Sequence, residues 1–445
     1  MEHTPAQNDR GSGNRLTHWI LAALALGIVV GMGVRLSGFD TADWVAACGF
    51  VTTIFLRLIK MVIAPLVVST LIVGIARMGA VESVGRVGLK AMVWFVGASL
   101  VSLSLGLVLV NLMQPGVDLG IELPDAGSAT GVVASALSLQ EFILHLVPTS
   151  IVDGMARNEI LQIVLFSVFF GIGCAGVGAP AKALVDALEG VAYVMLKVTM
   201  MVMWFAPVAV FAAVSAAIAK SGLDVIAVYG KFMAQFYLAI AILWGVLFVA
   251  AYLVLRQRTI GLFRAVQEPV LLAFATASSE AAYPKTLAQL ERFGCSNRVS
   301  SFVLPLGYSF NLDGSMMYCT FAVLFIAQAY GIELSVGQQL TMLLVLMVTS
   351  KGMAGVPRAS LVVIAATLAQ FNLPEAGLLL LLGIDHFLDM ARSATNVIGN
   401  SVASAVVSKW EGQLRDEDTE NPELEDALET PPPLHTSSGG TTKTH

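Results

Sequence analysis

Apolar stretches of about 20 residues recur through the first half of the chain and decide what it can fold into. Each is long enough to cross the hydrocarbon core of a bilayer as a helix. Only 13% of the residues are charged, whereas soluble domains have about 25%. We therefore expect an all-α polytopic membrane protein with no nucleic-acid partner. The expected spans lie near 17–37, 44–77, 84–113, 131–175, 182–220 and 226–256.

The pattern changes after residue 258, where small and polar residues interrupt the apolar segments. The two segments 259–294 and 335–372 have apolar arms too short to span singly, so re-entrant helical hairpins are predicted there. Each is followed by a longer helix, 299–330 or 374–410. Two interrupted segments in comparable positions indicate inverted repeats with a site at their interface. The total is eight transmembrane helices plus two re-entrant hairpins.

The distribution of Lys and Arg predicts the orientation, with both termini cytoplasmic. Residues 1–14 form a polar N-terminal tail, and 15–256 form the six N-terminal helices. Residues 257–412 are the C-terminal core, and 413–445 form an acidic, Pro-rich tail expected to be disordered. The four cysteines have no paired spacing, so neither disulfides nor a metal cluster is indicated.

A polar stripe interrupts the last apolar segment, in "IDHFLDMARSATNVIGN" (384–400). On a helix its five polar side chains fall within about 80° of one another; they are Asp385, Asp389, Arg392, Asn396 and Asn400. A seam that joins helices is one interpretation, but charged groups inside spans usually mark a substrate or ion pathway. Arg392 has the fork geometry to bind a carboxylate, and Asp389 can receive an ammonium group. The pair indicates a zwitterionic ligand with an extra carboxylate.

Three further motifs lie between apolar arms: "SSE" (278–280), "NLDGS" (311–315) and "GMAGVP" (352–357). The first and third lie at hairpin tips, where backbone N–H groups and helix N-termini favour anions. The second places Asn311 and Asp313 at mid-span, where an unwound turn offers oxygens to a cation. Each motif alone is also explained by turn chemistry or a helix kink.

Together these motifs identify a resemblance. Residues 40–412 resemble the dicarboxylate/amino acid:cation symporters, through "ASSEAAYP", "GYSFNLDGS", "SKGMAGVP" and "LDMARSATNVIGN" in that order. The resemblance implies a homotrimer in the bilayer, with most of the trimerisation scaffold in residues 15–256. It also implies a mobile transport domain, with its core in 257–412, that crosses the membrane as an elevator.

The resemblance also assigns substrate contacts. The two tip serines would bind the main-chain carboxylate, Asp389 the amino group and Arg392 the side-chain carboxylate. The implied substrate-binding residues are Ser278, Ser279, Ser315, Gly355, Val356, Asp389, Arg392, Ser393 and Asn396. Relatives specific for dicarboxylates usually lack an acid at the position of Asp389, which favours glutamate or aspartate here.

The chain departs from the sodium-coupled pattern of the family. Sodium-coupled relatives have Asp at the position of Asn400, and Tyr and Thr at those of Phe95 and Ala98. Because these oxygen donors are missing, proton coupling is favoured over sodium. The ion-coupling candidates are Glu280, Gly307, Asn311, Asp313, Asn396 and Asn400, with Ser350 at the position of a residual sodium site. Asp385 and Asp389 are further candidates for the proton carrier, with Glu280 or Asp313 preferred.

The sequence thus predicts a secondary active symporter that imports L-glutamate or L-aspartate across a bacterial inner membrane, without a cofactor. The alternatives are a C4-dicarboxylate symporter and sodium-coupled transport. A channel would need a continuous lined pore, whereas the polar residues here form one compact cluster. An intramembrane enzyme is disfavoured because no Gly-x-Ser-x-Gly elbow and no metal-binding His pair occurs.

Overall fold

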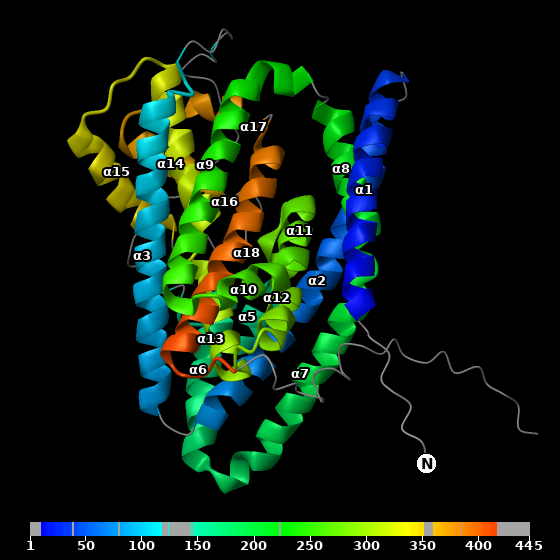
Figure 1. The fold of residues 1–445 in the computed structure, drawn as a ribbon, viewed down its shortest axis with the longest axis vertical. Helices are drawn as coiled ribbons and strands as arrows, with labels where there is room; N and C mark the ends of the chain where they lie inside the picture. The colour runs from blue at the N-terminus through cyan, green and yellow to red at the C-terminus, as the bar shows by residue number, and fades with distance from the viewer. Residues whose placement is uncertain are drawn as a thin grey trace, which may run out of the picture.

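The fold is a bundle of long helices, several of which run side by side around a central one (Figure 1). The computed structural model describes residues 10–37, 40–78, 81–117, 123, 144, 146–221, 224–350, 359–382 and 384–415. Within these ranges every regular element is a helix, apart from one isolated β-bridge between Cys295 and Leu414. Most of the acidic tail lies outside them.

Four long N-terminal helices lie where the apolar stretches predict them. They are α1 (Arg10–Leu36), α2 (Thr41–Met78), α3 (Val81–Met113) and α9 (Asp224–Leu255). Their apolar side chains are partly exposed, for example Leu26 on α1, Val93 on α3 and Leu253 on α9. Exposed apolar side chains on long helices suit contact with lipid or with another subunit.

Two expected spans differ from single helices. The segment 182–220 forms two helices, α7 (Lys182–Met203) and α8 (Ala206–Ser221), which meet at a 49° bend. Pro207 lies in the first turn of α8, where a missing N–H is tolerated. After the short α5 (Ile151–Arg157), α6 (Ile160–Val177) follows, and the one-turn helix η1 (Ala179–Ala181) leads into α7. Of the residues before 146 in the expected span 131–175, the structure describes only 144.

The C-terminal half consists of interrupted helices. Its elements are α10 (Arg258–Ala265), α11 (Gln267–Thr276), α12 (Ser279–Arg292), α13 (Asn297–Phe310), α14 (Asp313–Ala329), α15 (Val336–Thr349), α16 (Ala359–Gln370), η3 (Glu375–Gly377), α17 (Leu378–Leu382) and α18 (Asp385–Trp410). Helices α11 and α12 are separated by a turn at Ala277, which has φ 50°. Helices α13 and α14 are separated at Asn311 and Leu312, the mid-span break that "NLDGS" predicts.

Six helices of the described residues are long and apolar enough to cross a membrane, or seven if the bent α7–α8 pair is one span. Eight spans were expected. Helix α18 does not meet the apolar criterion, although its 26 residues give it a length of about 39 Å. Its polar stripe and many serines lower its hydropathy.

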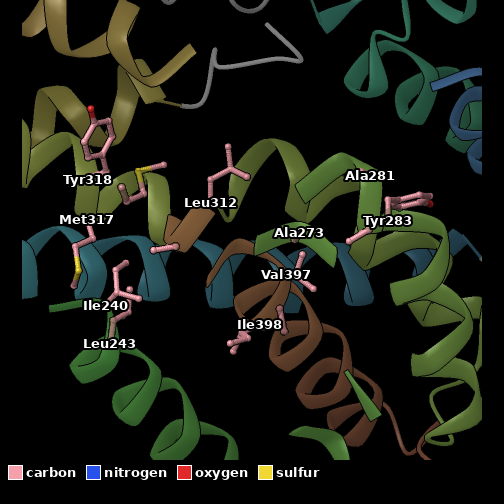
Figure 2. Packing of buried hydrophobic residues seen from close by; sticks show 14 of the residues in the cluster. Ile240, Leu243, Ala273, Ala281, Tyr283, Leu312, Met317, Tyr318, Val397 and Ile398 are labelled. Carbon is pink, nitrogen blue, oxygen red and sulfur yellow. The ribbon is translucent and has the colours of Figure 1, made fainter. Parts of the chain in front are cut away.

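Helix α18 is enclosed on every side, since all residues from Met390 to Ser408 are buried. It packs against α9, α11, α13 and α14. Figure 2 shows Val397 and Ile398 of α18 in the core that also contains Leu312, at the α13–α14 break, and Ile240 of α9. The sequence predicts an inward-facing stripe, whereas the structure surrounds the whole helix.

A second group of helices packs around α2, which contacts α6, α7 and α8. Helix α1 lies along α8 (Figure 1), with two glycines four residues apart at the contact. A Cβ on Gly31 would lie 2.6 Å from the Ser215 carbonyl oxygen and 2.9 Å from Ile218 Cβ. A Cβ on Gly27 would lie 3.0 Å from the Phe211 carbonyl oxygen. Small residues at this spacing allow close helix approach in membranes.

Ion pairs connect helix α3 to the C-terminal end of α18. Glu411 accepts hydrogen bonds from Arg86 Nη2 at 3.0 Å, and its Oε1 lies 2.6 Å from Lys90 Nζ. Burial alone would raise the pKa of Glu411, but the hydrogen bonds from Arg86 and Lys90 outweigh it and lower that pKa. The carboxylate is therefore ionised at neutral pH.

We predict that Gly31→Leu lowers the free energy of unfolding by about 1–3 kcal/mol, because its side chain overpacks the α1–α8 contact. The matched control is Gly33→Leu on the same helix, since a Cβ there has no neighbour within 4 Å. Thermal unfolding of both variants in detergent is the measurement. Equal stability of the two variants would contradict the close contact.

Candidate functional site

The break between α13 and α14 is stabilised by Asn396 of α18. Its Oδ1 accepts hydrogen bonds from the backbone N–H of Gly314 at 2.9 Å and of Ser315 at 3.3 Å. Its Nδ2 donates to Ser315 Oγ at 3.2 Å. The first N–H groups of a helix have no partner within it, and leaving them unpaired in a bilayer is costly. Asn396 thus holds the unwound turn open and against α18.

Glycines permit this close approach. A Cβ on Gly314 would collide with the Arg392 backbone, and a Cβ on Gly399 would collide with the Asp313 carboxylate. Any side chain at these positions would push α14 and α18 apart. The polar groups of the two helices can meet directly because these residues lack side chains.

Arg392 lies at the centre of the first polar cluster. Its Nε donates to Asp389 Oδ1 at 2.7 Å, and its Nη1 lies 3.6 Å from Asp385 Oδ1. The guanidinium carbon lies 4.6 Å from the centroid of the Tyr318 ring, which gives a cation–π contact. The Tyr318 hydroxyl donates to Asp385 Oδ1 at 3.1 Å. The guanidinium is therefore held by groups from both α14 and α18.

The two carboxylates beside Arg392 differ in access. The side chain of Asp389 is 24% exposed, whereas those of Arg392 and Asp385 are 4% and 3% exposed. Ser393 also donates its hydroxyl to Asp389 Oδ1, at 3.2 Å. Arg392 Nη1 makes no hydrogen bond within the described residues. The cluster thus offers an accessible carboxylate to a cationic group and a guanidinium donor to an anionic one.

A second polar cluster lies about two turns further along α18, at Asn400. Asn311 Nδ2 donates to Asp313 Oδ2 and to Asn400 Oδ1, at 3.2 Å in both cases. Ser102 of α3 donates its hydroxyl to Asp313 Oδ1 at 3.4 Å. Gly307 adjoins Asn400, since a Cβ there would collide with the Asn400 side chain.

This second cluster is a poor fit for sodium. A hard cation needs five or six oxygen ligands. Here Asn311 Nδ2 donates to Asp313 Oδ2 and Asn400 Oδ1, the two side-chain oxygens best placed to bind a cation. Among the described residues, the cluster has one carboxylate, that of Asp313. Ser99 donates to the Phe310 carbonyl oxygen at 3.5 Å, and Phe95 is fully buried. The residues present favour a hydrogen-bonded cluster over an ion shell.

The turn between α11 and α12, expected to be the first hairpin tip, leads into the helix N-terminus that the sequence predicts. Ser278 is the N-cap of α12, and its Oγ accepts from the Ala281 N–H at 3.3 Å. Ser279 begins the helix and Glu280 follows it. Helix α12 packs against α18, which carries Asp389 and Arg392.

At the expected second hairpin tip, 352–357, the structure describes only the flanking residues. Ser350, at the end of α15, is buried and donates its hydroxyl to the Met347 carbonyl oxygen at 3.2 Å. Gly355 and Val356 lie outside the described residues.

Three partners of the site were not expected from the sequence: Tyr318 over Arg392, Ser102 beside Asp313, and Lys60 beside Glu280. A hydroxyl-bearing aromatic in a buried helix usually has a polar partner, so Tyr318 gave a usable signal. Lys60 interrupts the long apolar stretch of α2, and a charge inside a span is such a signal too.

Comparison with known proteins agrees with the geometry. Residues 16–410 match the sequence profile described as the sodium:dicarboxylate symporter family. The chain is 38% identical over 403 residues to the "Proton/sodium-glutamate symport protein" of Geobacillus stearothermophilus, covering 89% of this chain and 95% of the relative.

Two further relatives have similar identity. The "Proton/glutamate-aspartate symporter" of Escherichia coli (strain K12) is 40% identical over 407 residues, covering 88% of this chain and 92% of the relative. The "C4-dicarboxylate transport protein" of Bacillus subtilis (strain 168) is 37% identical over 406 residues, covering 90% and 94%. With its apolar helices and a profile match over nearly its whole length, this multi-pass membrane protein belongs to the sodium:dicarboxylate symporter family.

Proposed function

We propose that the protein is a secondary active symporter that imports L-glutamate or L-aspartate together with protons. The observation that carries the proposal is the pair formed by Arg392 and the partly exposed Asp389. An acidic amino acid has two carboxylates and one ammonium group, and this pair complements one of each. Relatives of similar identity are named for glutamate and for glutamate-aspartate symport.

Substrate binding then replaces contacts within the protein. The side-chain carboxylate accepts from Arg392, whose Nη1 makes no hydrogen bond within the described part of the chain, and the ammonium group pairs with Asp389. Ser393 and Asn396 complete these contacts, with Ser315 across from Asn396. The main-chain carboxylate binds at Ser278 and Ser279, where the N-terminus of α12 favours an anion. Gly355 and Val356 are proposed to line the pocket with Ser315.

A C4-dicarboxylate is the second candidate substrate, because several relatives of similar identity are named for its transport. Arg392 serves both substrates. Asp389 distinguishes them, since a dicarboxylate has no ammonium group to pair with this carboxylate and would be repelled by it.

The proposed coupling ion is the proton, with sodium as the alternative. The amide of Asn311 already satisfies Asn400 and Asp313, so a cation would have to displace a buried donor. Glu280, Asp313 and the groups around them, Gly307, Asn311, Asn396 and Asn400, are the coupling candidates. Ser350 is the proposed position of a residual sodium site.

The proposed architecture is a homotrimer of eight transmembrane helices and two re-entrant hairpins per chain, in a bacterial inner membrane with both termini cytoplasmic. Two groups of packed helices support an elevator, one around α2 and one around α18. Helices α1, α2, α6, α7 and α8 supply the scaffold in this proposal. The site residues lie on α12, α14 and α18 and move with the second group.

The test is uptake of labelled L-aspartate into proteoliposomes with independently imposed proton and sodium gradients. We expect accumulation driven by an inward proton gradient, with succinate a weaker competitor than glutamate. Uptake driven only by sodium would overturn the coupling, and stronger competition by succinate would overturn the substrate.

Arg392→Lys is the variant that tests substrate recognition. It keeps the positive charge beside Asp385 and Asp389 but removes the planar fork, so aspartate affinity should fall by about 10-fold or more, the cost of a lost hydrogen bond to a charged group. Arg264→Lys on the exposed side of α10 is the matched control. Unchanged aspartate affinity in a folded Arg392→Lys protein would remove the guanidinium from the site.

Asn400→Asp tests the ion. It places a second carboxylate beside Asp313, and the repulsion of two buried carboxylates is relieved by a bound cation. Sodium, but not choline, should then raise the thermal unfolding midpoint, by an amount that grows with sodium concentration. The wild-type protein and Asn111→Asp, on an exposed side of α3, should show no such shift. An equal sodium response of all three proteins would contradict the interpretation of Asn400.

A further inference from the structure

An ion pair links the first hairpin tip to the neighbouring group of helices. Lys60 Nζ of α2 lies 3.8 Å from Glu280 Oε2 in the first turn of α12. The two side chains are 40% and 33% exposed. Glu280 directly follows Ser278 and Ser279, so its carboxylate shares one helical turn with the serines proposed to bind the substrate carboxylate.

Behind Glu280 lies a small cavity of about 30 Å³, between α2, α12, α13 and the α5–α6 connection. Its polar lining includes Glu280, Tyr283, Tyr308 and Asn158. Three of these side chains have a buried atom without a hydrogen-bond partner among the described residues: the Tyr283 and Tyr308 hydroxyls and Asn158 Oδ1. A cavity of this size with polar walls has room for about two waters. Waters in the cavity would adjoin the Glu280 carboxylate, which is part of its lining.

We propose that Glu280 binds the coupling proton, and that it does so because the substrate's main-chain carboxylate binds beside it. This inference rests on the proposed proton-coupled symport. Two carboxylates in one helical turn disfavour each other's ionised form. When substrate binds, one proton leaves water for the Glu280 carboxylate, and it returns to water when substrate leaves. By linkage, protonation of Glu280 raises substrate affinity by the same factor.

Lys60 has a defined part in this scheme. In the empty protein its ammonium group balances the ionised Glu280 across the α2–α12 contact. Without substrate, the Glu280 carboxylate can therefore remain ionised in this scheme. With substrate, a single lysine faces two carboxylates, and the added proton restores the balance of charge.

Four other carboxylates near the site differ from Glu280. Asp385 and Asp389 are held by Arg392. Glu268 of α11 pairs with Lys285 of α12 at 3.1 Å, and both side chains are less than a tenth exposed. Asp313 accepts from Ser102 and Asn311. Among these acids in the described residues, Glu280 alone lines the cavity and lies next to the tip serines.

Among the described residues, few titratable groups face the Glu280 carboxylate. From the elements packed against its turn, the described structure places Lys60 of α2 and Tyr308 of α13 toward it. Tyr283 lies on α12 itself, where Figure 2 labels it near Ala281. The tyrosines are neutral donors in the physiological range, so Lys60 is the charge that opposes protonation.

The test is aspartate binding by the purified protein, titrated by calorimetry in buffers of different ionisation enthalpy. For the wild type, affinity should weaken by up to about tenfold per pH unit across part of the range from pH ~6 to ~9, with about one proton taken up per aspartate. Glu280→Gln mimics the protonated acid, so its affinity should be independent of pH and its proton uptake lost. Glu333→Gln, in the exposed α14–α15 connection, should behave as the wild type.

Lys60→Met gives a second readout if Glu280→Gln does not fold. Loss of the ammonium group makes protonation of Glu280 easier, so the affinity profile should move to higher pH. An unmoved profile would overturn the role of Glu280 as the proton site.

The outcomes separate the two proposals. Proton uptake that persists in Glu280→Gln overturns this inference and leaves proton-coupled symport standing. Wild-type binding that depends on sodium and takes up no proton overturns both.

Discussion

Inside a bilayer, a broken helix must find partners for its free backbone groups within the protein, and this requirement organises the structure. The break between α13 and α14 exposes the first N–H groups of α14, and Asn396 accepts from two of them. This contact fixes the position of α18 against the unwound turn. Side chains of the two helices are then brought together, including Arg392 and the Tyr318 ring beneath it.

Close packing is the second requirement, and small residues meet it. Gly314 and Gly399 allow α14 and α18 to approach until backbone and carboxylate nearly touch. Gly27 and Gly31 do the same between α1 and α8. Lipid gives no hydrophobic drive for helices to associate, so such contacts hold the two groups of helices together internally. Between the groups, α2 meets α12 and α13. This contact is close at Gly74, where a Cβ would lie 2.9 Å from Ser301 Oγ, whereas a cavity and a longer ion pair lie beside Glu280.

The sequence predicts the parts of this arrangement that depend on local pattern. The helical period places Asp389, Arg392 and Asn396 on one side of a helix, and "NLDGS" marks the break. The sequence could not show that Asn396 caps α14, because that contact joins residues 81 and 82 positions apart. For the same reason it did not pair Lys60 with Glu280. The bend between α7 and α8 was missed although Pro207 marks it, because the apolar pattern continues across it.

The amide of Asn311 has a consequence for the energetics of the transport cycle. Where a cation would be captured and released at every turnover, this chain has hydrogen bonds to Asp313 and Asn400. Those bonds form when the protein folds, and they contribute to its conformational stability. With the proton as the proposed coupling ion, the driving force enters at Glu280 rather than at this cluster.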